Sequence, residues 1–146
     1  MNKDCCLYFC RNPQKNQKCE KDPVPFHKEL TVLSNFEDKH PIKINNNLIA
    51  LTAEHYFQSY KHINNKKLFK EILGARTKTG KVSPSIARKM GKGCIKTGIG
   101  RLNSFEIKKW NNDRYNIMCK VITEKFTQHL DLQQILLNTG NATLIE

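Results

Sequence analysis

One stretch of the chain combines a carboxylate, an amide and an ammonium group at spacings that suit chemistry. On an α-helix, Glu54, Gln58 and Lys61 fall within about 60° of one another. A carboxylate beside an apolar face can be partly desolvated, which suits acid–base work or the stabilisation of positive charge. The same pattern also fits an ordinary solvated face, because a glutamate in the first turn complements the helix dipole.

Local sequence signals predict the helices and strands around these three residues. A long helix is expected from about Ala53 to Leu73, with Thr52 as its N-cap and Gly74 as its end. Before it, two short apolar segments at 41–44 and 48–51 flank three asparagines, which favours a β-hairpin.

The second half of the chain is predicted to be mostly helical. Ser83 and Pro84 begin a short helix that ends at Gly91, and residues 91–104 are expected to form a basic loop. Trp110 leads into a second long helix, and a last helix covers about Asp131 to Asn138. Residues 142–146 look like the start of a strand. The fold class predicted is therefore α+β, dominated by helices, with a few short strands.

Composition limits the class of protein. The chain has 146 residues and a formal net charge of +12, which attracts anions such as nucleic acid or phosphorylated metabolites. No apolar run is long enough to span a membrane, and residues 1–10 do not form a signal peptide. A cytoplasmic protein is therefore expected, with a leader over residues 1–29 and a single domain over 30–146.

Cysteines and histidines do not form a recognisable metal motif. Cys6, Cys10, Cys19 and His27 are irregularly spaced, so zinc is not expected, and free thiols are the default interpretation. His55 and His62 do not match the spacing of a zinc-binding helix. They are expected at the surface or as supports for neighbouring site residues. No metal and no cofactor are predicted.

Several segments together resemble the NADAR superfamily of YbiA-like N-glycosidases. Their residues stand in the family's order, and the match covers about residues 30–146. The matching segments are Leu33–Phe36, Pro41–Ile42, Thr52–Gln58 with Lys61, Ser83–Gly91, Trp110, Lys125–Phe126, His129 and Leu132–Thr139.

The resemblance also has departures. Family members usually continue with an acidic residue, a Trp-Gly pair, a loop and a final helix, whereas this sequence stops at Glu146. The loops at 77–81 and 93–104 look longer than usual. We therefore expect a shallower cleft near Glu54, weakened activity, and an apolar strand end at Leu144–Ile145 without a pairing partner.

The resemblance implies an enzyme that cleaves a bond between ribose and nitrogen. One branch of the family releases ribose 5-phosphate from early intermediates of riboflavin biosynthesis, and another removes ADP-ribose from guanine in nucleic acid. A non-catalytic, basic nucleic-acid-binding module remains a third possibility, supported only by charge. The partner expected is a phosphorylated ribosyl small molecule or ADP-ribosylated nucleic acid, with no membrane. The oligomeric state is left open.

Roles for individual residues follow from this resemblance. Glu54 would stabilise positive charge at the anomeric carbon or activate water. Trp110 would stack on the base, although an aromatic anchor in the core is an equally good interpretation. Lys61 and Arg88 would contact phosphate, and the amides of Asn35 and Gln58 would bond ribose or base.

Overall fold

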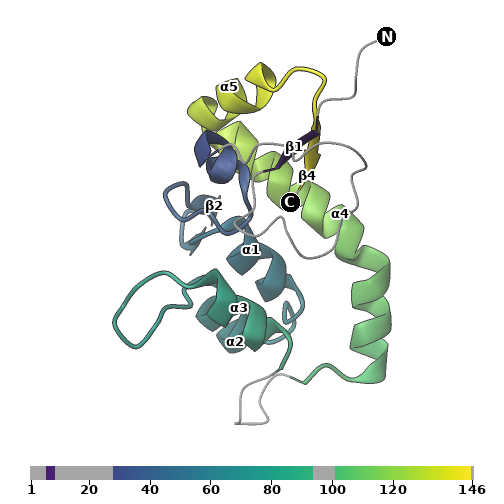
Figure 1. Ribbon diagram of the computed structural model, residues 1–146. Coiled ribbons are helices and arrows are strands. Elements are labelled where there is room, and N and C mark those ends of the chain that lie inside the picture. Colours follow the sequence, from purple (N-terminus) through teal and green to yellow (C-terminus); the bar gives the residue numbers. More distant parts are fainter. Residues whose placement is uncertain (1–5, 9–27, 94–100, 146) are drawn as a thin grey trace.

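The computed structural model describes residues 6–8, 28–93 and 101–145 (Figure 1). Within these residues the chain forms five α-helices, one 3₁₀ helix and four short strands, which confirms the predicted helix-dominated α+β fold. In chain order the elements are β1 (Cys6–Tyr8), η1 (Lys28–Leu33), β2 (Ile42–Asn45), β3 (Leu48–Ala50), α1 (Ala53–Tyr60), α2 (Lys66–Leu73), α3 (Pro84–Gly91), α4 (Ser104–Gln128), α5 (Leu130–Asn138) and β4 (Thr143–Ile145).

The predicted hairpin is present as β2 and β3, which pair antiparallel with Ile42 opposite Ala50. The backbone N–H of Asn47 donates to the side-chain oxygen of Asn45 at 2.9 Å, so the turn is stabilised by an asparagine side chain. Ile42 and Ala50 are fully buried, and the hairpin therefore supplies one wall of the core.

The single long helix predicted over 53–73 is wrong: the structure divides it into α1 and α2. Helix α1 ends at Tyr60, and the side chain of Asn65 caps the next helix by accepting from the N–H of Leu68 at 3.1 Å. Asparagine competes with the helical backbone for hydrogen bonds and so favours a cap over a helix interior. The predicted ends are confirmed, since Thr52 caps α1 and Gly74 ends α2.

The two later helices begin at clear capping signals. Ser83 caps α3 and Pro84 occupies its first turn, as predicted. Helix α4 begins at Ser104, about two turns before Trp110, so the prediction placed its start too late. A capping box between Asn103 and Glu106 explains that start, because each side chain accepts from the other's backbone N–H at 2.9 Å.

Helix α1 is the central element of the fold. It packs against α2, α3 and α4, and the hairpin covers its N-terminal end (Figure 1). The main core cluster is built around it from apolar side chains of five elements: Ile42, Ala50, Ala53, Tyr56, Leu73 and Val121. Because three helices surround α1, polar residues on its flanks are also withdrawn from water.

The two ends of the described chain meet. Strand β1 pairs parallel with β4, with Leu7 opposite Leu144. The expectation of an unpartnered strand end is therefore wrong, because residues near the start of the chain provide the partner. Leu144 also packs against the cluster formed by Leu30 and Leu33.

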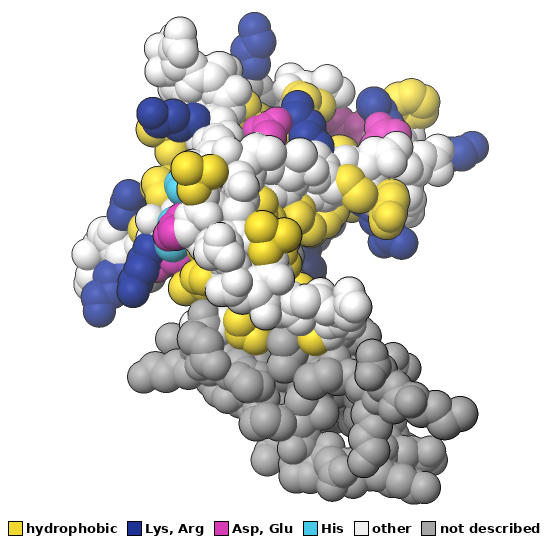
Figure 2. Space-filling model, turned by 90° about the horizontal axis from the view of Figure 1, so that it is seen from above, with side chains coloured by type: hydrophobic (Ala, Val, Ile, Leu, Met, Phe, Trp, Pro, Cys, Tyr) yellow, Lys and Arg dark blue, Asp and Glu magenta, His cyan; other side chains and the backbone are white. Residues whose placement is uncertain are grey.

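On the described part of the face seen in Figure 2, basic side chains do not form one continuous patch. Most lysine and arginine side chains there stand near the margin and apart from one another, and one basic group lies between acidic side chains. Among the described residues, no helix has the length and apolar character needed to cross a bilayer.

Candidate functional site

A cleft of about 870 Å³ lies between the segment that follows η1, the start of α1 and helix α3. Polar and charged side chains predominate among the residues around it. The lining residues are Thr31, Val32, Ser34, Asn35, Phe36, Glu37, Asp38, Lys39, Glu54, Phe57, Gln58, Pro84 and Arg88.

Glu54 is one of two little-exposed carboxylates of this cleft: its side chain is 9% exposed, and that of Glu37 is 8% exposed. The backbone N–H of Glu54 donates to the carbonyl of Asn35 at 2.9 Å, which joins the start of α1 to the opposite wall. Its Oε1 accepts from Nε2 of Gln58 at 2.9 Å, and Nε of Arg88 lies 4.0 Å from the same oxygen. The first turn of a helix and the nearby guanidinium both attract negative charge to this position.

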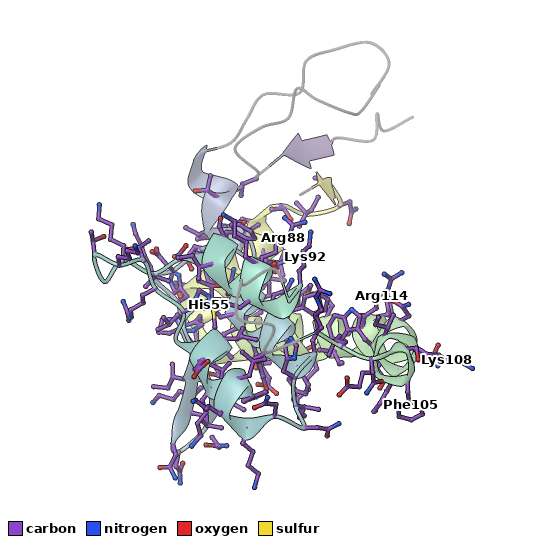
Figure 3. All side chains as sticks on the ribbon, turned by 90° about the horizontal axis from the view of Figure 1, so that it is seen from below. His55, Arg88, Lys92, Phe105, Lys108 and Arg114 are labelled. Carbon is purple, nitrogen blue, oxygen red and sulfur yellow. The ribbon has the colours of Figure 1, made fainter. Side chains whose placement is uncertain are left out.

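Arg88 and Gln58 stand at different depths beside Glu54. The Arg88 side chain is 56% exposed and lies next to Lys92 on the same side of α3 (Figure 3). Gln58 is only 4% exposed, and its amide donates to Glu54. Arg88 is therefore open to an incoming anion, whereas the Gln58 NH₂ group is already engaged by the carboxylate.

A buried lysine holds the cleft wall opposite α1. Lys125 of α4 is 1% exposed, and its Nζ donates to the carbonyls of Val32 at 3.0 Å and Ser34 at 2.8 Å. The next residue, Asn35, accepts from Glu54. Sequence reasoning gave Lys125 no role, although a lysine one turn after the buried Val121, on the inward face of a helix, is a detectable signal.

Lys61 and Trp110 line a second hollow, of about 370 Å³, between the end of α1 and helix α4. Nζ of Lys61 lies 5.0 Å from the Trp110 ring, and Phe57 meets that ring edge-on with centroids 4.8 Å apart. Phe57 also lines the cleft, so it stands between the two cavities. Residues lining the hollow are Tyr60, Lys61, Ile63, Asn64, Glu106, Lys109, Trp110, Asp113, Asn116, Ile117 and Lys120.

The cleft and the hollow are electrostatically connected at Lys61. Burial lowers the pKa of Lys61 from its ordinary value. Attraction to Glu54 opposes this change, while repulsion from Lys92 and Arg88 adds to it. Lys61 therefore senses the charges of the cleft although it lines the hollow.

Of the six predicted site residues, the structure brings four together. Asn35, Glu54, Gln58 and Arg88 line the cleft. Lys61 and Trp110 line the hollow. The predicted alignment of Glu54, Gln58 and Lys61 on one helix face is interrupted, because α1 ends at Tyr60 and Lys61 lies at the helix end.

The expectation that His55 and His62 lie at the surface is wrong, because both are buried. The alternative, that they support neighbouring residues, stays a prediction. Nδ1 of His55 lies 2.8 Å from the Thr52 hydroxyl, and Nε2 lies 2.9 Å from the carbonyl of Ala75. Burial lowers the pKa of both imidazoles, with a bond from His62 to the Gly91 backbone opposing the effect. Neither ring is among the side chains that line the cleft.

A histidine between two carboxylates connects the cleft to α5. His40 Nδ1 lies 2.9 Å from Glu37, which lines the cleft, and Nε2 lies 2.8 Å from Asp131. Burial lowers the pKa of His40, but the bonds to Glu37 and Asp131 outweigh it and the net shift is upward. Nothing in the local sequence pairs His40 with Asp131, since they are far apart along the chain.

No group of three or more histidine, cysteine, aspartate or glutamate side chains is arranged to hold a metal ion within the parts of the chain that the structure describes. Cys10, Cys19 and His27, which were considered as ligands, lie outside those parts, as does the side chain of Cys6.

Comparisons with known proteins point in one direction. A family model described as the NADAR domain matches residues 18–146. The N-glycosidase YbiA of Shigella flexneri serotype 5b (strain 8401) is 33% identical over 114 residues, covering 77% of this chain and 60% of that protein. The N-glycosidase YbiA of Escherichia coli (strain K12) is 32% identical over 107 residues, covering 73% of this chain and 56% of that protein.

The fold has a solved counterpart. The NMR structure of the E. coli protein YbiA is similar with a TM-score of 0.56 and 32% identity, over 78% of this chain and 58% of that one. The chain thus spans less than two thirds of the length of these relatives.

Proposed function

The chain belongs to the NADAR family, and we propose that it is an N-glycosidase acting on a phosphoribosylated pyrimidine amine from early riboflavin biosynthesis. Water would replace the amine at the anomeric carbon of ribose, releasing ribose 5-phosphate. One observation carries the proposal: a buried carboxylate, Glu54, lies in a roomy cleft with a cation, Arg88, beside it.

Glu54 suits the proposed chemistry. Breaking a ribosyl–nitrogen bond develops positive charge at the anomeric carbon. A carboxylate held at low exposure stabilises that charge more strongly than one in water, because the local dielectric is lower. The same group can instead take a proton from the attacking water, whose hydroxide joins the carbon while the departing nitrogen gains a proton.

Arg88 supports a phosphorylated substrate. Its half-exposed guanidinium is positioned to offer a charge-assisted hydrogen bond to phosphate, and Lys92, the residue that follows α3, lies beside it (Figure 3). Asn35, at the opposite wall, would bond the ribose.

The neighbouring hollow supports binding of the base. Trp110 and Tyr60 provide aromatic surface there, and Lys61 connects it electrostatically to the cleft. We assign Trp110 to stacking on the base and Lys61 to contact with an anionic group of the substrate.

The size of the cleft favours a second candidate substrate. About 870 Å³ is near the upper end of the range for small-molecule pockets, and an ADP-ribosyl group on guanine would fill more of it than a phosphoribosyl amine. A non-catalytic nucleic-acid-binding module has less support, because no recognised binding motif accompanies the net charge of +12.

Hydrolysis assays test the proposal. The purified chain is incubated with the first riboflavin-pathway intermediates and, separately, with ADP-ribosylated single-stranded DNA, while ribose 5-phosphate and ADP-ribose are measured. We expect release of ribose 5-phosphate, and a loss of at least about 100-fold in kcat for Glu54→Gln. Glu71→Gln, a change of an exposed glutamate on α2, is the matched control.

Three other outcomes of these assays would change or contradict the proposal. Release of ADP-ribose alone would replace the substrate by the second candidate. Salt-sensitive nucleic-acid binding with no cleavage of either substrate would contradict the enzyme proposal. Full turnover by Glu54→Gln would remove Glu54 from the mechanism.

A further inference from the structure

The last residue of α3 approaches α1 so closely that only glycine fits. A Cβ atom built on Gly91 would lie 2.9 Å from Cβ of Gln58 and would also overlap its Oε1. Real Cβ atoms essentially never lie this close to another heavy atom, so any larger residue at position 91 must displace Gln58. The backbone of Gly91 is not in the left-handed region, and the requirement is therefore steric.

Gln58 has little freedom to respond to such a change. It is 4% exposed and lies between Gly91 and the carboxylate of Glu54. Its NH₂ group must point to Glu54, because the opposite orientation would place two oxygens against each other. In the turn that follows α1, His62 bonds the Gly91 backbone, so α1 and the turn after it contact the end of α3 at two points.

We propose that Gly91 is a positioning residue for the carboxylate of Glu54, acting through Gln58. The absence of a side chain at 91 leaves the space that Gln58 occupies while it donates to Glu54. This inference rests on the proposed function only for its effect on catalysis, since the geometry can be tested without a substrate.

A set of five variants tests the inference: Gly91→Ala, Gln58→Ala, Gln58→Gly, the double variant of Gly91→Ala with Gln58→Gly, and Gly74→Ala as control. At Gly74 an added Cβ meets only the carbonyl of Lys70 at 3.8 Å, an ordinary contact. We expect Gly91→Ala and Gln58→Ala each to lower kcat about tenfold with KM little changed, because a hydrogen bond to a charged group is lost. Gly74→Ala should retain the kcat of the unsubstituted chain.

The double variant separates positioning from helix packing. For this comparison position 58 is made glycine, because alanine would keep the Cβ that lies 2.9 Å from the new methyl group. Gly91→Ala should have no further effect on kcat in the Gln58→Gly background. Effects that multiply would overturn the inference. If Gly91→Ala alone fails to fold, recovery of thermal stability in the double variant supports the steric conflict, and failure to recover it contradicts the conflict.

A measurement without substrate distinguishes this inference from the proposed function. Carbon NMR of the Glu54 carboxyl follows its titration in each variant. Loss of the Gln58 donor makes the carboxylate easier to protonate, so the midpoint should move to higher pH in Gly91→Ala and Gln58→Ala but stay in place in Gly74→Ala. An unchanged midpoint in Gly91→Ala would overturn the inference even if the chain hydrolyses nothing.

Discussion

The cleft and the hollow lie on either side of Phe57 but are built differently. In the cleft, Glu54 and Gln58 are buried. The backbone of Glu54 bonds to Asn35, and Gln58 packs against Gly91 of α3. In the hollow, Lys61 and Trp110 are only partly buried and contact each other. The difference indicates that the cleft is held in one geometry suited to chemistry, whereas the hollow can adjust to a bound group.

The largest expected effect concerns two lysines of α4, one for each region. Lys125→Met leaves the carbonyls of Val32 and Ser34 without their ammonium donor and should lower the free energy of unfolding by about 2–4 kcal/mol. Lys120→Met removes an exposed bond to Tyr60 beside the hollow and should change it by less than about 1 kcal/mol. Urea denaturation measures the free energy of unfolding of both variants. Equal losses would contradict the inference that the cleft is more rigid than the hollow.

The next effect separates binding from chemistry. Trp110→Leu removes the indole ring from the hollow and should raise KM about tenfold with kcat unchanged, because stacking on Trp110 is lost while the residues of the cleft remain. Trp110→Phe should keep most of the affinity. Steady-state kinetics measure KM and kcat for both variants. A loss confined to kcat would contradict the assignment of substrate binding to the hollow and of chemistry to the cleft.

A smaller effect is expected at the open side of the cleft. Arg88→Ala should raise KM for a phosphorylated substrate about fivefold, since the side chain is half-exposed and its charge is partly screened. The dephosphorylated substrate should show no change. Lys89→Ala, an exposed neighbour on α3, serves as the control, and an equal rise for both substrates would argue against contact with phosphate.

The smallest effect is a pH dependence at His40. The pKa of His40 is raised above its ordinary value of 6.5 by Glu37 and Asp131, despite partial burial. Its stabilising contribution is therefore complete below pH 6.5 and is lost as pH rises through the higher folded value. The bond to His40 lowers the pKa of Asp131, so that contribution is lost in acid.

Comparison of the chain with His40→Ala across pH measures this contribution. The difference in free energy of unfolding should be below about 1 kcal/mol, largest near pH 5–6 and smaller above pH 8. A difference that grows with rising pH would contradict the assignment.

Much of the fold was predictable because its signals are local. Thr52, Gly74, Ser83 and Pro84 mark helix ends through bonds or dihedral angles that involve only their near neighbours. The pairing of Glu54 with Gln58 was predictable for the same reason, since residues four apart meet on a helix. The prediction of one helix over 53–73 is wrong, because Asn65 caps a second helix within an otherwise continuous helical pattern.

The sequence by itself determined that Glu54 and Gln58 lie one turn apart on the same face of a helix, and it identified Glu54 as the candidate carboxylate. Tertiary structure decided the rest: that His55 is a core residue, that Lys125 holds the cleft wall, and that Gly91 stands against Gln58. These contacts join segments that are distant along the chain. Their geometry depends on how three helices pack around α1, and helix periodicity carries no information about that packing.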